Sequence, residues 1–182
     1  MMTVVKRLIR ATAPVLVAAL ALAGCGGTTM QEGVVVNGSA YSVQEVEETT
    51  RQFSELSGQA VAPQAVISIA GAVPVLDDYF AGSTYQASES SLRDQLAGGG
   101  LDGEPGELTL DVARYQYYAS VLNDPAVQAD PAMADVLAQV NNYAADLAEQ
   151  DVRVNPRFGA WDPQAGQVVP QVPSWITPSD AS

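Results

Sequence analysis

The sequence contains no histidine, one cysteine (Cys25) and one lysine (Lys6). Without histidine there is no Ser-His-Asp or Cys-His catalytic pair, no imidazole zinc site and no histidine general base. A Schiff-base enzyme or a P-loop needs a lysine at its site, and Lys6 stands in the N-terminal segment, ahead of any predicted domain. A single cysteine also excludes a disulfide within the chain. Carboxylates are therefore the main reactive side chains left.

Basic residues are scarce. Eight Lys and Arg stand against 21 Asp and Glu, for a formal net charge of −13 at pH 7. Three of the eight, Lys6, Arg7 and Arg10, precede Cys25, and no acidic residue does, so a chain beginning at Cys25 carries five against 21, or −16. Phosphate binding requires a basic surface, and we therefore expect no nucleic-acid partner.

The acidic residues do not form a recognisable catalytic or metal-binding motif. Asp77-Asp78 and Glu47-Glu48 are adjacent pairs, and neighbours on a helix point about 100° apart, so neither pair converges on one substrate. The acidic loop 102–107 lacks the alternating ligand spacing and the closing glutamate of an EF-hand. We predict that the protein is not an enzyme and holds no metal or other cofactor.

The first 24 residues have the order of a secretory signal: a basic head, an apolar stretch over 11–23 and small residues before Cys25. The apolar stretch is shorter than the roughly 20 residues that cross a bilayer. Leu22-Ala23-Gly24-Cys25 resembles the lipobox of bacterial lipoproteins, which implies cleavage before Cys25 and lipidation of its sulfur. The alternative is an ordinary signal peptide with an incidental cysteine.

Two acyl chains anchor a protein stably, whereas one binds only marginally. We therefore expect a protein anchored to the cell membrane through lipid on Cys25, facing the extracytoplasmic side. Residues 25–33, rich in glycine and threonine, are expected to form a flexible tether.

Helical patterns dominate from residue 34 onward. Ser42 and Glu45 have capping-box spacing, and Gly58 is placed to end the first helix. Its apolar stripe is Val43, Val46, Thr50, Phe53 and Leu56.

The later helices are bounded mainly by proline, serine and glycine. Pro63 begins a second helix, in which Pro74 predicts a kink near 70–74 or a division into two helices. The remaining predicted helices are a short one capped by Ser88 or Ser90 and ended by Gly98–Gly100, one from near Thr109 to Asp124-Pro125, and a long one from Asp130-Pro131 through Leu147.

Two short strands are expected at the ends of the helical region. Val34–Asn37 is predicted to turn directly into the first helix and to pair with Val152–Asn155. Beyond Gln164 the proline-rich chain is expected to run extended on the surface. The predicted fold is mainly α, a five- to six-helix orthogonal bundle with a small two-stranded sheet joining the N- and C-terminal segments.

Two segments resemble the ends of the SurA- and PrsA-like chaperone N-terminal domain. The first is Val35-Val36-Asn37-Gly38 followed by 41–46, and the second is the run from Val152 to Asp162, which ends in Val-Asn-Pro-Arg-Phe-Gly-Ala-Trp-Asp. The resemblance spans 34–162 and leaves 163–182 as a tail. Many family members carry a parvulin-type prolyl isomerase domain between the two segments, for which this chain has no room.

The resemblance implies a chaperone-like holdase that binds unfolded or nascent exported polypeptides without prolyl isomerase activity. Its clients would contact aromatic and apolar side chains in a groove between helices. The candidate groove residues, each of which could instead belong to the core, are Phe53, Leu56, Tyr79, Phe80, Tyr115, Tyr117 and Tyr118. The alternative is a structural or assembly lipoprotein that binds one specific envelope partner.

Trp161 and Trp175 have two possible roles. Each could contact clients or fix the C-terminal tail to the helical body. The packing role is favoured for Trp161, while neither role is favoured for Trp175.

The lipobox makes a direct prediction for Cys25→Ala. Cells fed labelled palmitate should incorporate label into the parent chain and none into the variant, because the acylated sulfur has been removed. Absence of label on the parent, detected by immunoprecipitation at equal expression, would show that the cysteine is incidental.

Overall fold

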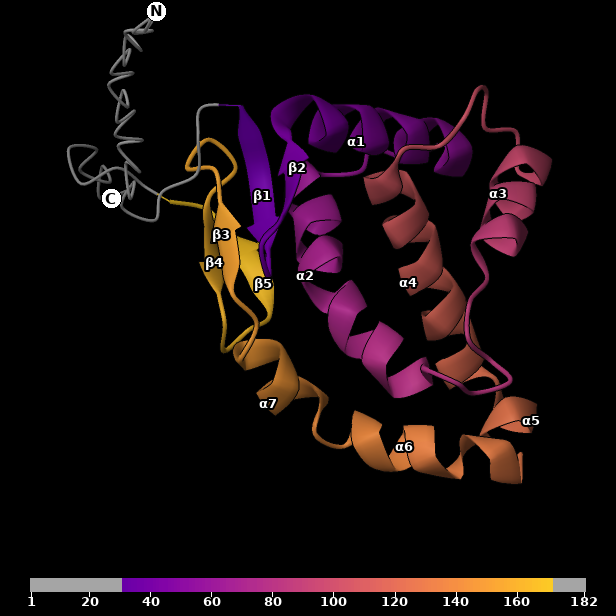
Figure 1. Cartoon of the computed structure of the whole chain (residues 1–182). Coiled ribbons are helices and arrows are strands. Elements are labelled where there is room, and N and C mark those ends of the chain that lie inside the picture. The colour runs from indigo at the N-terminus through magenta and orange to yellow at the C-terminus, as the bar shows by residue number, and fades with distance from the viewer. Residues whose placement is uncertain (1–30, 172–182) are drawn as a thin grey trace, which may run out of the picture.

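The computed structural model describes residues 31–171 (Figure 1). The predicted signal segment, Cys25 and residues 172–182 lie outside the described residues. Within 31–171 the chain forms seven α-helices, one 3-10 turn and five short strands, which confirms a mainly α fold with a small antiparallel β component. None of the described helices has both the length and the apolar character needed to span a membrane.

The first sheet joins the two ends of the helical region. Its order is β2-β1-β3, with β1 (Glu32–Val36) between β2 (Ser39–Ser42) and β3 (Val152–Val154), all antiparallel. The predicted pairing of the N- and C-terminal segments is confirmed. The sheet has three strands where two were predicted. The third strand, β2, forms because Asn37 and Gly38 both have positive φ (49° and 89°) and turn the chain into a hairpin before the helix begins.

Helix α1 (Val43–Ser57) begins and ends where the sequence predicts. Ser42 Oγ accepts the Glu45 backbone N–H, the Glu45 side chain accepts the Ser42 N–H, and Gly58 ends the helix in a left-handed conformation. The buried face differs from the predicted stripe. It comprises Val46, Thr49, Gln52 and Phe53, whereas Thr50 and Leu56 are half-buried.

Helix α2 (Pro63–Phe80) is the central element, and it packs against α4 (Glu107–Asn123) along its length. It runs without a break across Pro74, so the predicted alternative of two helices is wrong. Helix α3 (Glu89–Gly98) is capped by Ser88, whose Oγ accepts the Ser91 N–H at 3.2 Å. In Figure 1, α1 lies across the upper ends of α2 and α4.

The last helical segment is broken, contrary to the prediction of one long helix from 130 to 147. After α5 (Pro125–Gln128) the chain forms a 3-10 turn at Pro131–Met133, then α6 (Ala134–Val140) and α7 (Tyr143–Ala148). The break falls at Asn141-Asn142. The Asn141 side-chain amide donates to the Leu137 carbonyl, which is the competition with the helix backbone that makes asparagine a poor helix former.

The chain after residue 159 forms a second hairpin, which the sequence reading missed. Strand β4 (Ala160–Asp162) pairs with β5 (Gln167–Val169), and Asp162 Oδ1 accepts the N–H groups of Gln164 and Ala165 in the turn. Strand β5 lies on α2, where the Val168 N–H donates to Ser68 Oγ at 2.9 Å. The domain therefore continues past the expected boundary at 162, and 164–169 is not a free extended tail.

Four residues of the segment 155–162 have clear structural roles. Asn155 Nδ2 donates to the Glu32 carbonyl at 2.8 Å, and Phe158 is buried in the core. Gly159 has φ 124°, and a Cβ there would lie 2.3 Å from the Val169 carbonyl oxygen. Trp161 packs against Gly71 of α2, so this run attaches the C-terminal end of the domain to β1 and α2.

Two apolar clusters form the core. The first lies among the sheet, α1, α3 and the N-terminal halves of α2 and α4; the second lies among the C-terminal halves of α2 and α4 and the helices α6 and α7. In the second cluster Phe80 stacks on Tyr118 with ring centroids 4.2 Å apart. Trp161 packs against both clusters, so the second hairpin holds them together.

The contact of Trp161 with Gly71 predicts opposite effects for two glycine substitutions in helices. Gly71→Ala places a Cβ 2.8 Å from Trp161 Cη2 and should lower the free energy of unfolding by about 1–3 kcal/mol. Gly98→Ala meets no atom within 4 Å and should raise it by about 0.4–1 kcal/mol. Urea unfolding curves measure both, and changes of the same sign would contradict the packing described for Trp161.

Candidate functional site

Four of the seven candidate groove residues are in the core. Phe53 is 6% exposed, Tyr79 is 7% exposed, and Phe80 and Tyr118 are fully buried. The Tyr79 hydroxyl donates to Asp146, and the Tyr118 hydroxyl donates to Asp77 Oδ1 at 2.8 Å. These side chains hold the helices together, as the core interpretation of aromatic residues on a helix face expects.

The other three candidates are half-buried and lie in different places. Leu56 packs on the edge of the first cluster and Tyr115 on the second, while Tyr117 touches both. The Tyr117 ring is 5.7 Å from that of Tyr118. The seven predicted residues therefore do not line one continuous groove.

Two of them, Phe53 and Leu56, do share a groove between α1, α3 and α4. We call it the apolar groove; its volume is about 290 Å³, and its walls are Phe53, Leu56, Ser57, Gln95, Leu96, Gly99, Ala113 and Gln116. None of these side chains is charged. In a chain with a net charge of −13, this is an unusual stretch of surface.

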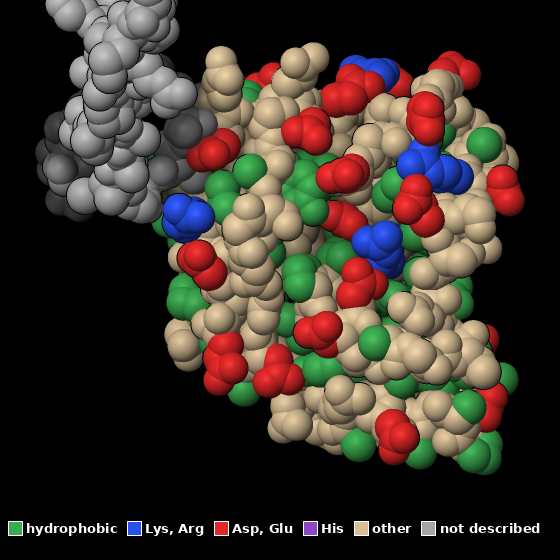
Figure 2. Space-filling model, viewed as in Figure 1, with side chains coloured by type: hydrophobic (Ala, Val, Ile, Leu, Met, Phe, Trp, Pro, Cys, Tyr) green, Lys and Arg blue, Asp and Glu red, His purple; other side chains and the backbone are tan. Residues whose placement is uncertain are grey.

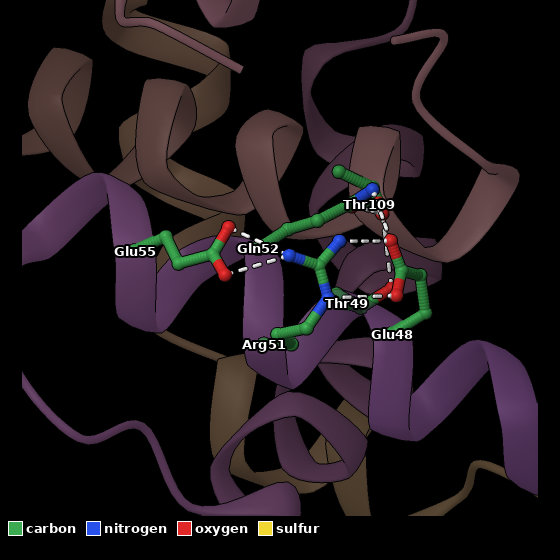
Figure 3. A network of polar contacts seen from close by, with 6 residues as sticks. All are labelled: Glu48, Thr49, Arg51, Gln52, Glu55 and Thr109. Carbon is green, nitrogen blue, oxygen red and sulfur yellow. Dashed lines mark hydrogen bonds and ion pairs between the residues drawn. The ribbon is translucent and has the colours of Figure 1, made fainter. Parts of the chain in front are cut away.

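A network of polar contacts sets the spacing of α1 and α4 beside this groove (Figure 3). Thr49 Oγ1 and Thr109 Oγ1 are 3.0 Å apart, and Thr109 Oγ1 donates to Gln52 Oε1 at 2.7 Å. All three side chains are buried. Because buried polar groups are costly when unpaired, this link fixes which residues of the two helices face each other.

The network continues outward to exposed charges. Gln52 Nε2 donates to Glu48 Oε1 at 3.0 Å, and Arg51 bridges Glu48 and Glu55. The hydrogen bond from Arg51 lowers the pKa of Glu48. The sequence analysis did not find the buried Thr49–Gln52–Thr109 link, because its polar side chains break the apolar periodicity on which the helix prediction rests.

A second hollow, which we call the acidic cleft, lies between the β1–β2 hairpin and α2 and α4. It has a volume of about 340 Å³ and contains Tyr41, Asp77, Asp78 and Asp111 over an apolar wall of Val36, Ala70, Val73 and Pro74. On the face of the molecule shown in Figure 2, acidic side chains greatly outnumber basic ones.

Two of the three carboxylates of the acidic cleft are held by fixed donors. The Tyr41 hydroxyl donates to Asp111 Oδ2 at 2.6 Å, and Arg114 Nη1 lies 2.5 Å from Asp111 Oδ1 and 3.5 Å from Asp77 Oδ2. Burial raises the pKa of Asp111, while the Tyr41 hydrogen bond and the Arg114 charge oppose that rise. Burial and the same hydrogen bond raise the pKa of Tyr41, which therefore stays a donor at neutral pH.

Two of the three carboxylates in the cleft have fixed partners. Asp111 is bonded to Tyr41 and Arg114, and Asp77 accepts from Tyr118 and lies near Arg114. The third carboxylate, Asp78, is exposed. Within residues 31–171 there is no group of three or more carboxylate or thiol side chains placed to hold a metal ion. The sequence analysis considered Asp77-Asp78 only as an adjacent pair. It could not predict the convergence with Asp111, which lies on another helix between two buried residues.

The comparisons add no family assignment. No protein-family model matches this chain, and neither the curated proteins nor the solved structures contain a significant match.

The acidic cleft predicts a stability loss for Tyr41→Phe, which removes a donor from a mostly buried carboxylate. The free energy of unfolding at pH 7 should fall by about 1.5–3 kcal/mol. Tyr85→Phe is the matched control: its hydroxyl donates to Asp130 Oδ2 at 2.7 Å, and Asp130 is less buried than Asp111. A loss no larger in Tyr41→Phe than in Tyr85→Phe, measured by urea unfolding, would contradict this role.

The pH dependence gives a second readout of the same variant. Because burial raises the pKa of Asp111 in the folded chain, this group favours folding most at low pH, and its contribution declines as the pH rises through the folded-state pKa. The hydrogen bond from Tyr41 lowers the pKa of Asp111, because it stabilises the charged carboxylate. The difference in free energy of unfolding between the parent and Tyr41→Phe should therefore become smaller on acidification, as Asp111 becomes protonated.

Proposed function

We propose that this chain is a membrane-tethered, non-enzymatic holdase that binds unfolded polypeptides emerging outside the cytoplasmic membrane. The observation that carries this function is the uncharged apolar groove between α1, α3 and α4. The resemblance of its two ends to SurA- and PrsA-like chaperones supports the same role, as does the pairing of those ends in one sheet.

The apolar groove suits weak and unselective binding. Burying one client leucine or phenylalanine side chain is worth about 1.5–3 kcal/mol, and no charge in the groove walls selects among client sequences. A lipid on Cys25 would raise the local concentration of the holdase at the membrane where its clients emerge. Binding there would become more frequent without any gain in intrinsic affinity. The strong negative charge keeps a protein with an open apolar groove soluble.

A specific observation also favours the alternative, a structural or assembly lipoprotein with one envelope partner. The acidic cleft presents carboxylates in fixed positions, held by Tyr41, Tyr118 and Arg114. Fixed charges of this kind give specificity more than affinity. A partner that used the cleft would carry a basic surface.

Aggregation assays with several chemically denatured clients distinguish the two functions. The holdase should suppress aggregation of all of them at near-stoichiometric ratios, and raised salt should have little effect on apolar binding. Tight, salt-sensitive binding to one basic partner, with no suppression elsewhere, would support the assembly role.

Leu56→Ser tests the groove itself. Removing this half-buried side chain from the groove wall should weaken suppression of aggregation several-fold. Leu137→Ser is the matched control, because Leu137 is also half-buried but lies on α6, away from the groove. Equal losses in both variants, at equal thermal stability, would place client binding elsewhere.

A further inference from the structure

The apolar groove has a second hollow beside it, which we call the charged pocket. It lies between α1 and the loop that follows α3, and its volume is about 310 Å³. Leu56 and Gly99 line both hollows, so the two adjoin at these residues. The walls of the charged pocket are Arg51, Gln52, Glu55, Leu56, Gly99, Gly100, Leu101 and Asp102.

The two hollows are close enough for one extended polypeptide to contact both. They meet where Leu56 lies near Gly99: a Cβ added at Gly99 would be 3.8 Å from Leu56 Cδ2. In an extended chain, residues i and i+2 share a face and lie about 7 Å apart. Two such side chains can therefore enter the two hollows on either side of this contact.

The charged pocket is acidic. Arg51 Nη1 donates to both carboxylate oxygens of Glu55 at 2.7 Å, and Arg51 Nε donates to Glu48 Oε2 at 3.0 Å (Figure 3). The positive charge of Arg51 is thus shared between two carboxylates. Asp102 is exposed, and its side chain has no hydrogen bond or ion pair with another described residue. Together these side chains carry one positive charge against three negative charges.

The loop holds Asp102 in a defined place. Just before it, the Leu101 N–H donates to the Leu96 carbonyl at 3.0 Å, and the Leu101 side chain packs on the first apolar cluster. Two residues beyond Asp102, Glu104 Oε1 lies 3.1 Å from Arg93 Nη1 on α3. Asp102 therefore belongs to the wall that the loop contributes, while Glu55 belongs to the wall that α1 contributes.

The charges of the two hollows differ, and so do the side chains that suit them. The apolar groove has uncharged walls and suits a large apolar side chain. A lysine or arginine suits the charged pocket, because its aliphatic stem can lie on Leu56 while its charge meets the carboxylate of Asp102.

We propose that the apolar groove and the charged pocket together bind extended client segments in which a basic residue stands two positions from a large apolar residue. This inference rests on the proposed holdase function and names its client class. The apolar contact supplies most of the affinity, because an exposed ion pair changes a binding constant by about fivefold at most. The charge therefore gives a preference among clients and is not required for binding.

Short peptides of glycine and serine, blocked at both ends, test the preference. Each carries one phenylalanine and, two positions away, Lys, Gln or Glu, and both orders are made. Binding to the complete chain in lipid nanodiscs is followed by the NMR signals of the Leu56 methyl groups. In at least one order the Lys peptide should bind about two- to fivefold more tightly than the Gln peptide, and the Glu peptide more weakly. The difference should disappear at about 1 M salt, where the Debye length is about 3 Å.

Variants of Asp102 test where the preference arises. Asp102→Asn should reduce it, and Asp102→Lys should reverse it in favour of the Glu peptide. Asp94→Asn is the matched control and should keep the parent's preference. Asp94 is also exposed and without a partner among the described residues, but it lies on the face of α3 opposite the buried Leu92 and Leu96.

The outcomes separate this inference from the holdase itself. Equal binding of the three peptides, all weakened by Leu56→Ser, would overturn the client preference and leave the holdase in place. An equal loss of preference in Asp94→Asn and Asp102→Asn would assign the preference to the net charge of the chain and overturn the role of the pocket. Binding of none of the peptides would overturn this inference and also count against the holdase.

Discussion

The pairing of β1 with β3 is the interaction on which the rest of the structure depends. It joins strands more than a hundred residues apart, and Val34 and Val36 from its centre enter the first apolar cluster. Two strands this short are marginal alone, so the helices that cover them must be in place as well. Loss of the pairing would free β1, the start of α1 and the C-terminal hairpin together, and with them the β1–β2 wall of the acidic cleft.

The second constraint is the close contact of Trp161 with Gly71. Because the Trp161 indole packs directly on the backbone of α2, position 71 must be a residue without a side chain. This contact lets β4 lie where both apolar clusters meet. The binding surfaces follow from this frame. The Thr49–Gln52–Thr109 link sets the helix spacing beside the apolar groove, while Tyr41 and Arg114 fix the acidic cleft.

Local signals predicted much of this fold, and interactions between distant residues account for the rest. Ser42, Glu45, Gly58 and Ser88 act within a few residues of themselves, so the first and third helices were predictable from caps. The break at Asn141-Asn142 was missed because the apolar stripe continues across it. Asp111 gave no signal, since Tyr41, which donates to it, and Asp77, which shares Arg114 with it, come from other elements. Burial of the aromatic residues also depends on how separate helices pack, and four of the seven predicted groove residues proved to be core.

The most direct test of the holdase is photocrosslinking in intact cells from a probe at Gln116, a neutral and exposed residue of the apolar groove. A holdase should give a broad ladder of adducts with many exported polypeptides, which should weaken when Leu56→Ser is introduced. A single adduct of defined mass, unaffected by that substitution, would contradict the holdase and indicate one dedicated envelope partner.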